Sequence, residues 1–170
     1  MAGHPYPLKQ LNQLFRNLGD GRYTEVSGQA GSSFEASHVS RGAAFGDIDQ
    51  DGAPDVVIAN NAGPARVLLN IMDNGHDWIG LRLVTSDGRR DAYGARVALD
   101  ADRPLWRRVR EDGSYASSND PRVLFGLGKE GPARRLARVV WPDGAEERFT
   151  NLSTGRYHLL RQGRGTESPP

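Results

Sequence analysis

Cysteine is absent from this 170-residue chain, which excludes both a disulfide framework and a thiolate metal site. Long apolar runs are absent too, and none approaches the roughly 20 residues that a membrane-spanning helix needs. The opening Met-Ala-Gly-His-Pro-Tyr-Pro has no apolar segment like the centre of a signal peptide. From these residues alone we expect either a cytoplasmic protein or part of a longer chain whose export signal lies upstream.

Motifs of nucleophilic and phosphoryl-transfer enzymes are also missing. The chain contains no Gly-x-Ser-x-Gly elbow and no Gly-Lys-Ser/Thr phosphate loop. Its histidines form no His-Glu-x-x-His pair and are scattered, at His4, His38, His76 and His158. His76 lies in a polar stretch between two aspartates, where a solvated linker is favoured over an incidental metal contact. We therefore expect a protein that is not an enzyme.

Lysine occurs only at Lys9 and Lys129, so arginine carries almost all of the basic charge. Residues 1–77 hold five Lys/Arg against nine Asp/Glu, a balance of −4, whereas residues 78–165 hold 17 against 11, a balance of +6. An acidic part followed by a basic part indicates two modules that have different partners or that attract each other. The arginine bias has two interpretations, genomic base composition or a surface that binds polyanions.

Glycine and proline are plentiful, at 21 and 10 residues, which favours short strands joined by tight turns over long helices. The pattern of the first part predicts strands at residues 13–17, 23–26, 43–45, 56–59 and 66–69. Of these, Val56–Ala59 is a continuous apolar run, typical of a strand that is buried on both faces. We expect helical turns only within residues 2–18 and 151–155.

Longer strands with alternating polarity are predicted beyond residue 77, at residues 78–84, 95–99, 105–110, 122–127, 136–141, 146–149 and 157–160. Three Asp-Gly pairs between them, at residues 87–88, 112–113 and 143–144, favour hairpin turns. Regularly spaced short strands with such turns indicate a sandwich or a small barrel.

The most informative segment for chemistry is Asp47–Asp55, with the sequence Asp-Ile-Asp-Gln-Asp-Gly-Ala-Pro-Asp. Its carboxylates recur at positions 1, 3, 5 and 9, which are Asp47, Asp49, Asp51 and Asp55. A hard cation such as calcium takes six to eight oxygen ligands, and alternate residues of a tightly curled loop can point to one centre. Gly52 permits the bend, and Ala53 is placed to supply a main-chain carbonyl. The spacing therefore predicts a calcium site with these four aspartates and the Ala53 carbonyl as ligands.

This loop is not an EF-hand, because position 12 is Ile58 and the flanking residues predict strands rather than helices. The alternative interpretation is a solvated Asp/Gly turn without a metal.

Residues 44–52 (Ala-Phe-Gly-Asp-Ile-Asp-Gln-Asp-Gly), followed by Asp-Val-Val-Ile-Ala-Asn at residues 55–60, resemble the FG-GAP/VCBS repeat. Residues 14–23 resemble the strand–turn–strand segment that closes such a repeat, and residues 60–70 resemble the same segment in the next repeat. The resemblance implies a blade of a β-propeller of the integrin type. Since a propeller needs several blades, we expect only a partial propeller here.

The second part resembles the ASPIC/UnbV domain in its segments Trp-Ile-Gly-Leu, Tyr-Gly-Ala-Arg-Val, Gly-Ser-Tyr-Ala-Ser, Phe-Gly-Leu-Gly and Val-Trp-Pro-Asp-Gly, which begin at residues 78, 93, 113, 125 and 140. This domain follows FG-GAP/VCBS repeats in the cartilage acidic protein-like family, and the pairing implies an extracellular or cell-surface setting. Residues 87–93 depart from the pattern of the family, so we assign no ligand role to that loop.

Together these features predict an all-β chain, with a partial β-propeller blade that carries the calcium loop and then a β-sandwich-like ASPIC/UnbV domain. We expect the following division: an N-terminal extension at residues 1–11, the blade at 12–71, a linker at 72–77, the ASPIC/UnbV-like domain at 78–163 and a disordered tail at 164–170. A partial blade exposes strand edges, which favour self-association unless the second domain or a partner covers them. We also expect arginines of the second domain to face the acidic blade.

Among the tryptophans, Trp78 and Trp141 lie in apolar strand contexts and are expected in the core. Trp106 is the candidate for an exposed aromatic side chain, beside Arg107, Arg108 and Arg110. This cluster indicates either a surface for an acidic glycan or nucleic acid, or an ordinary solvated strand face.

The resulting hypothesis is a non-enzymatic, calcium-binding interaction or adhesion module with a structural cation. Its partner is expected to be a protein or a glycan, with neither nucleic acid binding nor a membrane span. The alternatives are a module that binds acidic glycans, or an accessory region of a larger secreted enzyme.

Overall fold

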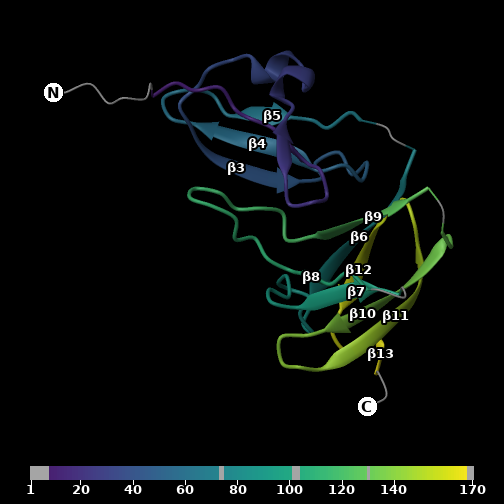
Figure 1. Cartoon of the computed structure of the whole chain (residues 1–170). Helices are drawn as coiled ribbons and strands as arrows, with labels where there is room; N and C mark the ends of the chain where they lie inside the picture. Colours follow the sequence, from purple (N-terminus) through teal and green to yellow (C-terminus); the bar gives the residue numbers. More distant parts are fainter. Residues whose placement is uncertain (1–7, 73–74, 101–103, 130, 168–170) are drawn as a thin grey trace.

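The computed structural model describes residues 8–72, 75–100, 104–129 and 131–167. These residues form an almost all-β protein, as predicted, with a small N-terminal part that packs on a larger C-terminal part (Figure 1). Within the described ranges, no helix is long and apolar enough to cross a membrane.

The N-terminal part contains a hairpin and a small antiparallel sheet. The hairpin pairs β1 (Phe15–Asn17) with β2 (Tyr23–Glu25). The sheet has the order β3-β4-β5, formed by β3 (Ser40–Gly46), β4 (Asp55–Asn60) and β5 (Arg66–Leu68). Between hairpin and sheet lie two 3₁₀ turns, η1 (Ser27–Gln29) and η2 (Ser32–Phe34). The described parts of the ranges in which we expected helical turns contain none. The two 3₁₀ turns lie instead in the glycine- and serine-rich stretch at residues 27–34.

The prediction that the run Val56–Ala59 is buried on both faces is wrong. Within it only Ile58 is buried, at 6% exposure, and Ala59 is exposed. On the same sheet Phe45 and Val67 are 52% and 56% exposed. A single three-stranded sheet lacks the neighbouring layers that cover both faces of a central strand. The blade therefore has few strands and also leaves apolar side chains of those strands exposed.

The C-terminal part is built from two facing sheets. One has the order β12-β6-β9, with β6 (Asp77–Val84), β9 (Val123–Gly128) and β12 (Tyr157–Arg161), and β12 runs parallel to β6. The other has the order β13-β11-β10-β7-β8, with β7 (Arg96–Leu99), β8 (Arg107–Arg108), β10 (Arg134–Val140), β11 (Glu146–Ser153) and β13 (Thr166–Glu167).

The core lies between these two sheets, which confirms the predicted sandwich. Alternate side chains of β6 face alternate side chains of β7 and β10, as the period of a strand requires. Trp141 belongs to this core at 2% exposure, as expected. The largest fully buried members are Ile79, Leu81, Leu83, Val97, Val109, Val139, Trp141 and Leu160.

The prediction for the C-terminal tail differs from the structure in its described part. Residues 164–170 were expected to be a disordered tail, but Thr166 and Glu167 form β13 against β11, and residues 168–170 lie outside the described residues. Both oxygens of the buried Glu147 carboxylate accept backbone N–H groups, from Gly163 and Gly165, at 2.7 Å each. Those two bonds tie the end of the described chain to the sandwich. At the other end, in the described part of the predicted extension, the backbones of Gln10 and His38 exchange hydrogen bonds.

The long loop between β8 and β9 extends along β3 and joins the two parts (Figure 1). Ala43 N donates to Ser117 Oγ at 3.0 Å, and Phe45 N donates to Asn119 Oδ1 at 3.0 Å. Phe45 in turn accepts from Asp120 N at 2.9 Å. The C-terminal part therefore covers the β3 edge of the blade, whereas the β5 edge pairs with no other described strand.

Candidate metal centre

The Asp-rich loop, residues 47–55, connects β3 to β4 and is wrapped around its own first carboxylate. Asp47 Oδ1 accepts from Asp51 N at 3.1 Å, and Asp47 Oδ2 accepts from Gly52 N at 3.0 Å. The loop turns at Gln50 and Gly52, whose φ angles are 62° and 91°. Glycine tolerates positive φ angles best, followed by asparagine and aspartate. Gly52 therefore fits its position, whereas Gln50 has a strained backbone.

The last carboxylate of the loop links three segments of the blade. Asp55 Oδ2 accepts from Ile48 N at 2.8 Å, and Asp55 Oδ1 accepts from Asn70 N at 2.8 Å. Asp55 is 1% exposed, so this carboxylate is held by main-chain donors away from water. The bonds fix the start of the loop and the end of the segment after β5 around one buried group.

Asp47, Asp49 and Asp55 form a compact cluster. Each offers one carboxylate oxygen, and these atoms lie within 4.8 Å of one another. Asp47 and Asp55 are buried, whereas Asp49 is exposed. Among the described residues, no arginine or lysine forms an ion pair with any of the three. Carboxylates that crowd together without a cationic partner repel one another, and an all-oxygen set of this kind could hold a metal ion.

Asp51 lies outside this cluster, although the sequence pattern gives it the same weight as the others. Its Oδ1 accepts from Ala53 N at 2.8 Å, and the side chain is exposed. The structure thus brings together three of the four predicted aspartates. The assignment of Asp51 and of the Ala53 carbonyl as ligands stays a prediction, as does metal binding by the other three.

Two side chains of the C-terminal part contact the first residue of the loop, and sequence reasoning missed both. Tyr157 OH donates to Asp47 Oδ2 at 2.8 Å, and Arg122 Nη2 donates to the Asp47 carbonyl at 2.7 Å. Burial and the bond to Asp47 raise the pKa of Tyr157 above its ordinary value. Asp47 therefore accepts hydrogen bonds from both parts of the molecule.

Arg122 is itself held in place on two sides. Its guanidinium forms an ion pair with Asp120 at 2.6 Å, and this hydrogen bond raises the pKa of the arginine. The guanidinium carbon lies 4.3 Å from the centre of the Tyr157 ring, a cation–π distance. The expectation that arginines of the second domain face the acidic blade is thus met at Arg122, through a carbonyl rather than a carboxylate.

Trp78 was expected in the core, and this is wrong: its half-buried ring lies against the Asp-rich loop. A Cβ atom added at Gly52 would lie 2.3 Å from ring atoms of Trp78. The indole also meets the Tyr157 ring edge-on, with centroids 5.4 Å apart. A Cβ atom at Gly80 would lie 2.2 Å from the Tyr157 ring, which explains the glycine in the Trp-Ile-Gly-Leu segment. Gly52 thus leaves room for the Trp78 ring, and Gly80 leaves room for the Tyr157 ring.

A cleft of about 650 Å³ lies beside this contact and has walls from both parts of the molecule. Asp47 and Gly52 line it from the blade, and Tyr157 and Arg122 line it from the sandwich. Arginines of the segment around β8 complete the lining, namely Arg107, Arg108 and Arg110.

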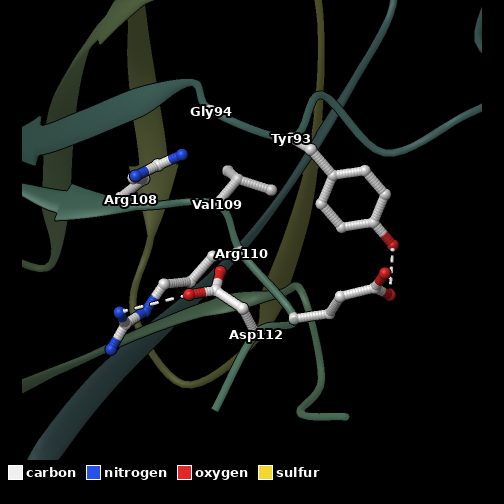
Figure 2. A pocket seen from close by; sticks show the side chains of 7 residues that line it. Tyr93, Gly94, Arg108, Val109, Arg110 and Asp112 are labelled. Carbon is white, nitrogen blue, oxygen red and sulfur yellow. Dashed lines mark hydrogen bonds and ion pairs between the residues drawn. The ribbon is translucent and has the colours of Figure 1, made fainter.

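A second cavity, of about 290 Å³, lies around Tyr93 and the end of β8 (Figure 2). Tyr93 OH donates to Glu111 Oε2 at 2.9 Å, and this bond raises the pKa of the phenol. Arg110 forms a 3.7 Å ion pair with Asp112 (Figure 2). Tyr93, Glu111, Arg110 and Asp112 thus interact with one another, whereas Arg108, which also lines the cavity, forms no ion pair with a described residue.

The predicted cluster around Trp106 divides between two faces of its sheet. Arg108 is exposed on the outer face, whereas Arg107 lies on the inner side, with its guanidinium carbon 5.4 Å from the centre of the Phe125 ring. Trp106 is 39% exposed, as expected for this residue.

Comparison with known proteins identifies both parts of the chain. Residues 9–58 match the profile of the FG-GAP-like repeat, and residues 85–167 match the profile described as ASPIC and UnbV. Cartilage acidic protein 1 of Homo sapiens is 38% identical over 157 residues, which cover 91% of this chain and 21% of that protein. The protein of the same name from Mus musculus is 27% identical over 157 residues, which cover 91% of this chain and 22% of that protein.

A shorter match joins the same group. Cartilage acidic protein 1 of Xenopus tropicalis is 38% identical over 64 residues, which cover 38% of this chain and 10% of that protein. The chain thus spans about a fifth of the length of the two mammalian relatives. With an FG-GAP-like repeat followed by an ASPIC/UnbV domain, the chain belongs to the family of which these cartilage acidic proteins are members.

Proposed function

We propose that this chain is a non-enzymatic interaction module in which one calcium ion, held by the Asp-rich loop, stabilises the contact between blade and sandwich. The observation that carries the proposal is the cluster of Asp47, Asp49 and Asp55, whose carboxylate oxygens lie within 4.8 Å of one another. Two of these side chains are almost completely buried, at 3% for Asp47 and 1% for Asp55. A cation between them removes the repulsion that burial would otherwise strengthen.

Calcium suits this donor set better than zinc or magnesium. The available ligands are carboxylate and carbonyl oxygens, and calcium accepts six to eight such oxygens with irregular geometry. Zinc favours histidine and cysteine ligands, and the chain contains no cysteine. Magnesium keeps several waters and demands octahedral geometry, which a loop with three clustered carboxylates does not favour.

The role of the ion is structural in this proposal. Asp47 faces the proposed ion and also accepts from Tyr157 OH at 2.8 Å, so ion binding fixes a side chain that the sandwich holds. The ion supplies positive charge at the loop, and Tyr157 and Arg122 hold the same residue from the other side. Calcium binding and the docking of the two parts should therefore strengthen each other.

The names of the relatives support a proposal about the setting. The relatives are named after cartilage, a tissue made largely of extracellular matrix. From this name we infer that the chain works outside the cell or at its surface. Calcium is millimolar in that setting, so even a site with a dissociation constant of about 10⁻⁴–10⁻³ M is filled. The partner is a protein or glycan that contacts exposed loops and strand edges of the blade and the sandwich, which the cation holds together.

Isothermal titration calorimetry with calcium, and separately with magnesium, tests the proposal. We expect one calcium ion per chain, weaker binding of magnesium, and at least a tenfold loss of calcium affinity in Asp49→Ala, which removes one charged ligand. Asp87→Ala is the matched control, because that exposed aspartate lies in a turn of the sandwich and belongs to no acidic cluster among the described residues. No binding by the native chain, or equal affinity in Asp49→Ala, contradicts the calcium site.

A further inference from the structure

The outer face of the five-stranded sheet carries a row of arginines that neither the fold nor the proposed calcium site uses. Arg108 of β8 lies opposite Arg96 of β7, and Arg138 of β10 lies opposite Arg148 of β11. All four side chains are exposed. Their neighbours in sequence on β7 and β10 belong to the core, so the four arginines share the solvent side of the sheet.

Trp106 joins this row to the start of β8. The guanidinium carbons of Arg96 and Arg138 lie 5.9 Å and 5.7 Å from the centre of its ring. At these cation–π distances the indole holds two arginines of different strands in place and reduces their freedom before any ligand arrives. We call Arg96, Arg108, Arg138, Arg148 and Trp106 the arginine face.

The positive charge of the arginine face is only partly compensated. Glu146 forms an ion pair with Arg138 at 2.7 Å, and Asp100 follows at the end of β7. The other three arginines form no ion pair with any described residue. Like charges directly opposite each other on adjacent strands destabilise a sheet, and both arginine pairs have this arrangement.

A cost to stability at exposed positions outside the core points to an anionic ligand that removes this cost. We propose that the arginine face binds an acidic polysaccharide, a polymer with repeated carboxylate or sulfate groups. Adjacent strands are about 4.8 Å apart, so arginines on four adjacent strands spread over roughly 14 Å. Several anionic groups of one chain can bind along that length, and the planar guanidinium donates two parallel hydrogen bonds to an oxyanion.

Nucleic acid fits these observations less well. The chain has a net charge of +1 and an isoelectric point near 8.1, below the strongly basic balance of nucleic-acid-binding domains. The one aromatic ring of the arginine face already has two guanidinium groups beside it, which leaves no open platform on which bases can stack.

The test compares two triple variants in binding to heparin, by retention on immobilised heparin and by titration. Arg96→Gln/Arg108→Gln/Arg148→Gln removes three charges of the arginine face and leaves the ion pair between Arg138 and Glu146 intact. Arg89→Gln/Arg90→Gln/Arg164→Gln removes three exposed charges elsewhere on the same domain. We expect at least about tenfold weaker binding for the first variant and at most about twofold for the second, because charge-assisted contacts are local.

The native chain must bind heparin at physiological ionic strength, and added heparin should raise its thermal midpoint but not that of the first variant. Hyaluronan, which carries carboxylates without sulfates, then shows which anionic group is recognised. The single variant Arg108→Gln, at an exposed position on a two-residue strand, is the check on folding and should keep the native midpoint while losing about threefold in affinity. Equal losses in the two triple variants, no retention of the native chain, or tighter binding to single-stranded DNA or anionic vesicles overturns the proposal.

Discussion

At the scale of single residues, Gly52 shows how one position meets two demands. Its φ angle is 91°, which favours glycine, and its missing side chain leaves room for the Trp78 ring. The sequence showed the first demand, because a sharp bend in an Asp-rich loop needs such a residue. The second demand joins residues 26 positions apart and became visible only in three dimensions.

We expect Gly52→Ala to be more destabilising than Gly144→Ala. Gly144 has a φ angle of 88° and no atom within 4 Å of an added Cβ, so that variant reports the backbone strain alone, about 1 kcal/mol. Gly52→Ala adds a clash at 2.3 Å with Trp78 and should cost about 1–3 kcal/mol more. Urea unfolding of the two variants measures the difference, and equal losses would contradict the contact between the loop and Trp78.

The carboxylates of the Asp-rich loop give a second comparison of single residues. Asp49 belongs to the cluster with Asp47 and Asp55, whereas Asp51 accepts from Ala53 N and lies outside it. We expect Asp49→Ala to lose most of the calcium affinity. Asp51→Ala should lose less of the calcium affinity than Asp49→Ala. Calorimetric titration of both variants decides between this order and the equal weights that the sequence pattern predicts.

At the scale of elements, the sequence predicted most strands of both parts but few of the contacts between them. Alternation located β6, β7, β9 and β10, because core-facing side chains follow the period of a strand. The tail is a different case: β13 has two residues, too few for a periodic signal, and depends on hydrogen bonds to Glu147 from 16 and 18 positions away. Tyr157 likewise reaches Asp47 across 110 positions, a pairing that no local pattern encodes.

That long-range bond leads to a prediction for the contact between β12 and the loop. Tyr157→Phe removes one donor from the buried Asp47 carboxylate, and we expect it to cost about 1–2 kcal/mol of stability. Tyr93→Phe also removes a phenol–carboxylate bond, to Glu111, but at an exposed position, where the loss should stay below about 0.5 kcal/mol. Denaturant unfolding of the pair gives both values. If Tyr157→Phe loses as little unfolding free energy as Tyr93→Phe, the hydrogen bond from Tyr157 to Asp47 does not stabilise the contact.

At the scale of the whole molecule, the C-terminal part covers one strand edge of the blade and leaves the other edge open. Hydrogen bonds between β3 and residues 117–120 occupy the β3 edge, whereas β5 has no strand partner on its outer side among the described residues. The expectation that blade edges favour self-association therefore narrows to the β5 edge. A neighbouring blade of a longer protein would occupy the same position.

Self-association through β5 should respond to charge on that strand. Val67 is 56% exposed on β5, and Val67→Lys should shift the chain towards the monomer in sedimentation velocity at high protein concentration. Ile71→Lys is the control, since Ile71 is 87% exposed but lies outside any strand. A native chain that stays monomeric at millimolar concentration, or an equal shift in both variants, would contradict pairing through this edge.

The central claim is that a cation in the Asp-rich loop stabilises the folded chain, and thermal unfolding tests it most directly. The native chain and Asp49→Ala are each melted in excess calcium and in excess chelator. Calcium at about 100-fold above its dissociation constant should raise the native midpoint by on the order of 5–10 °C, and Asp49→Ala should lose most of that rise. An identical native midpoint in calcium and in chelator would contradict the account, because the loop would then be a hydrogen-bonded acidic turn without a structural ion.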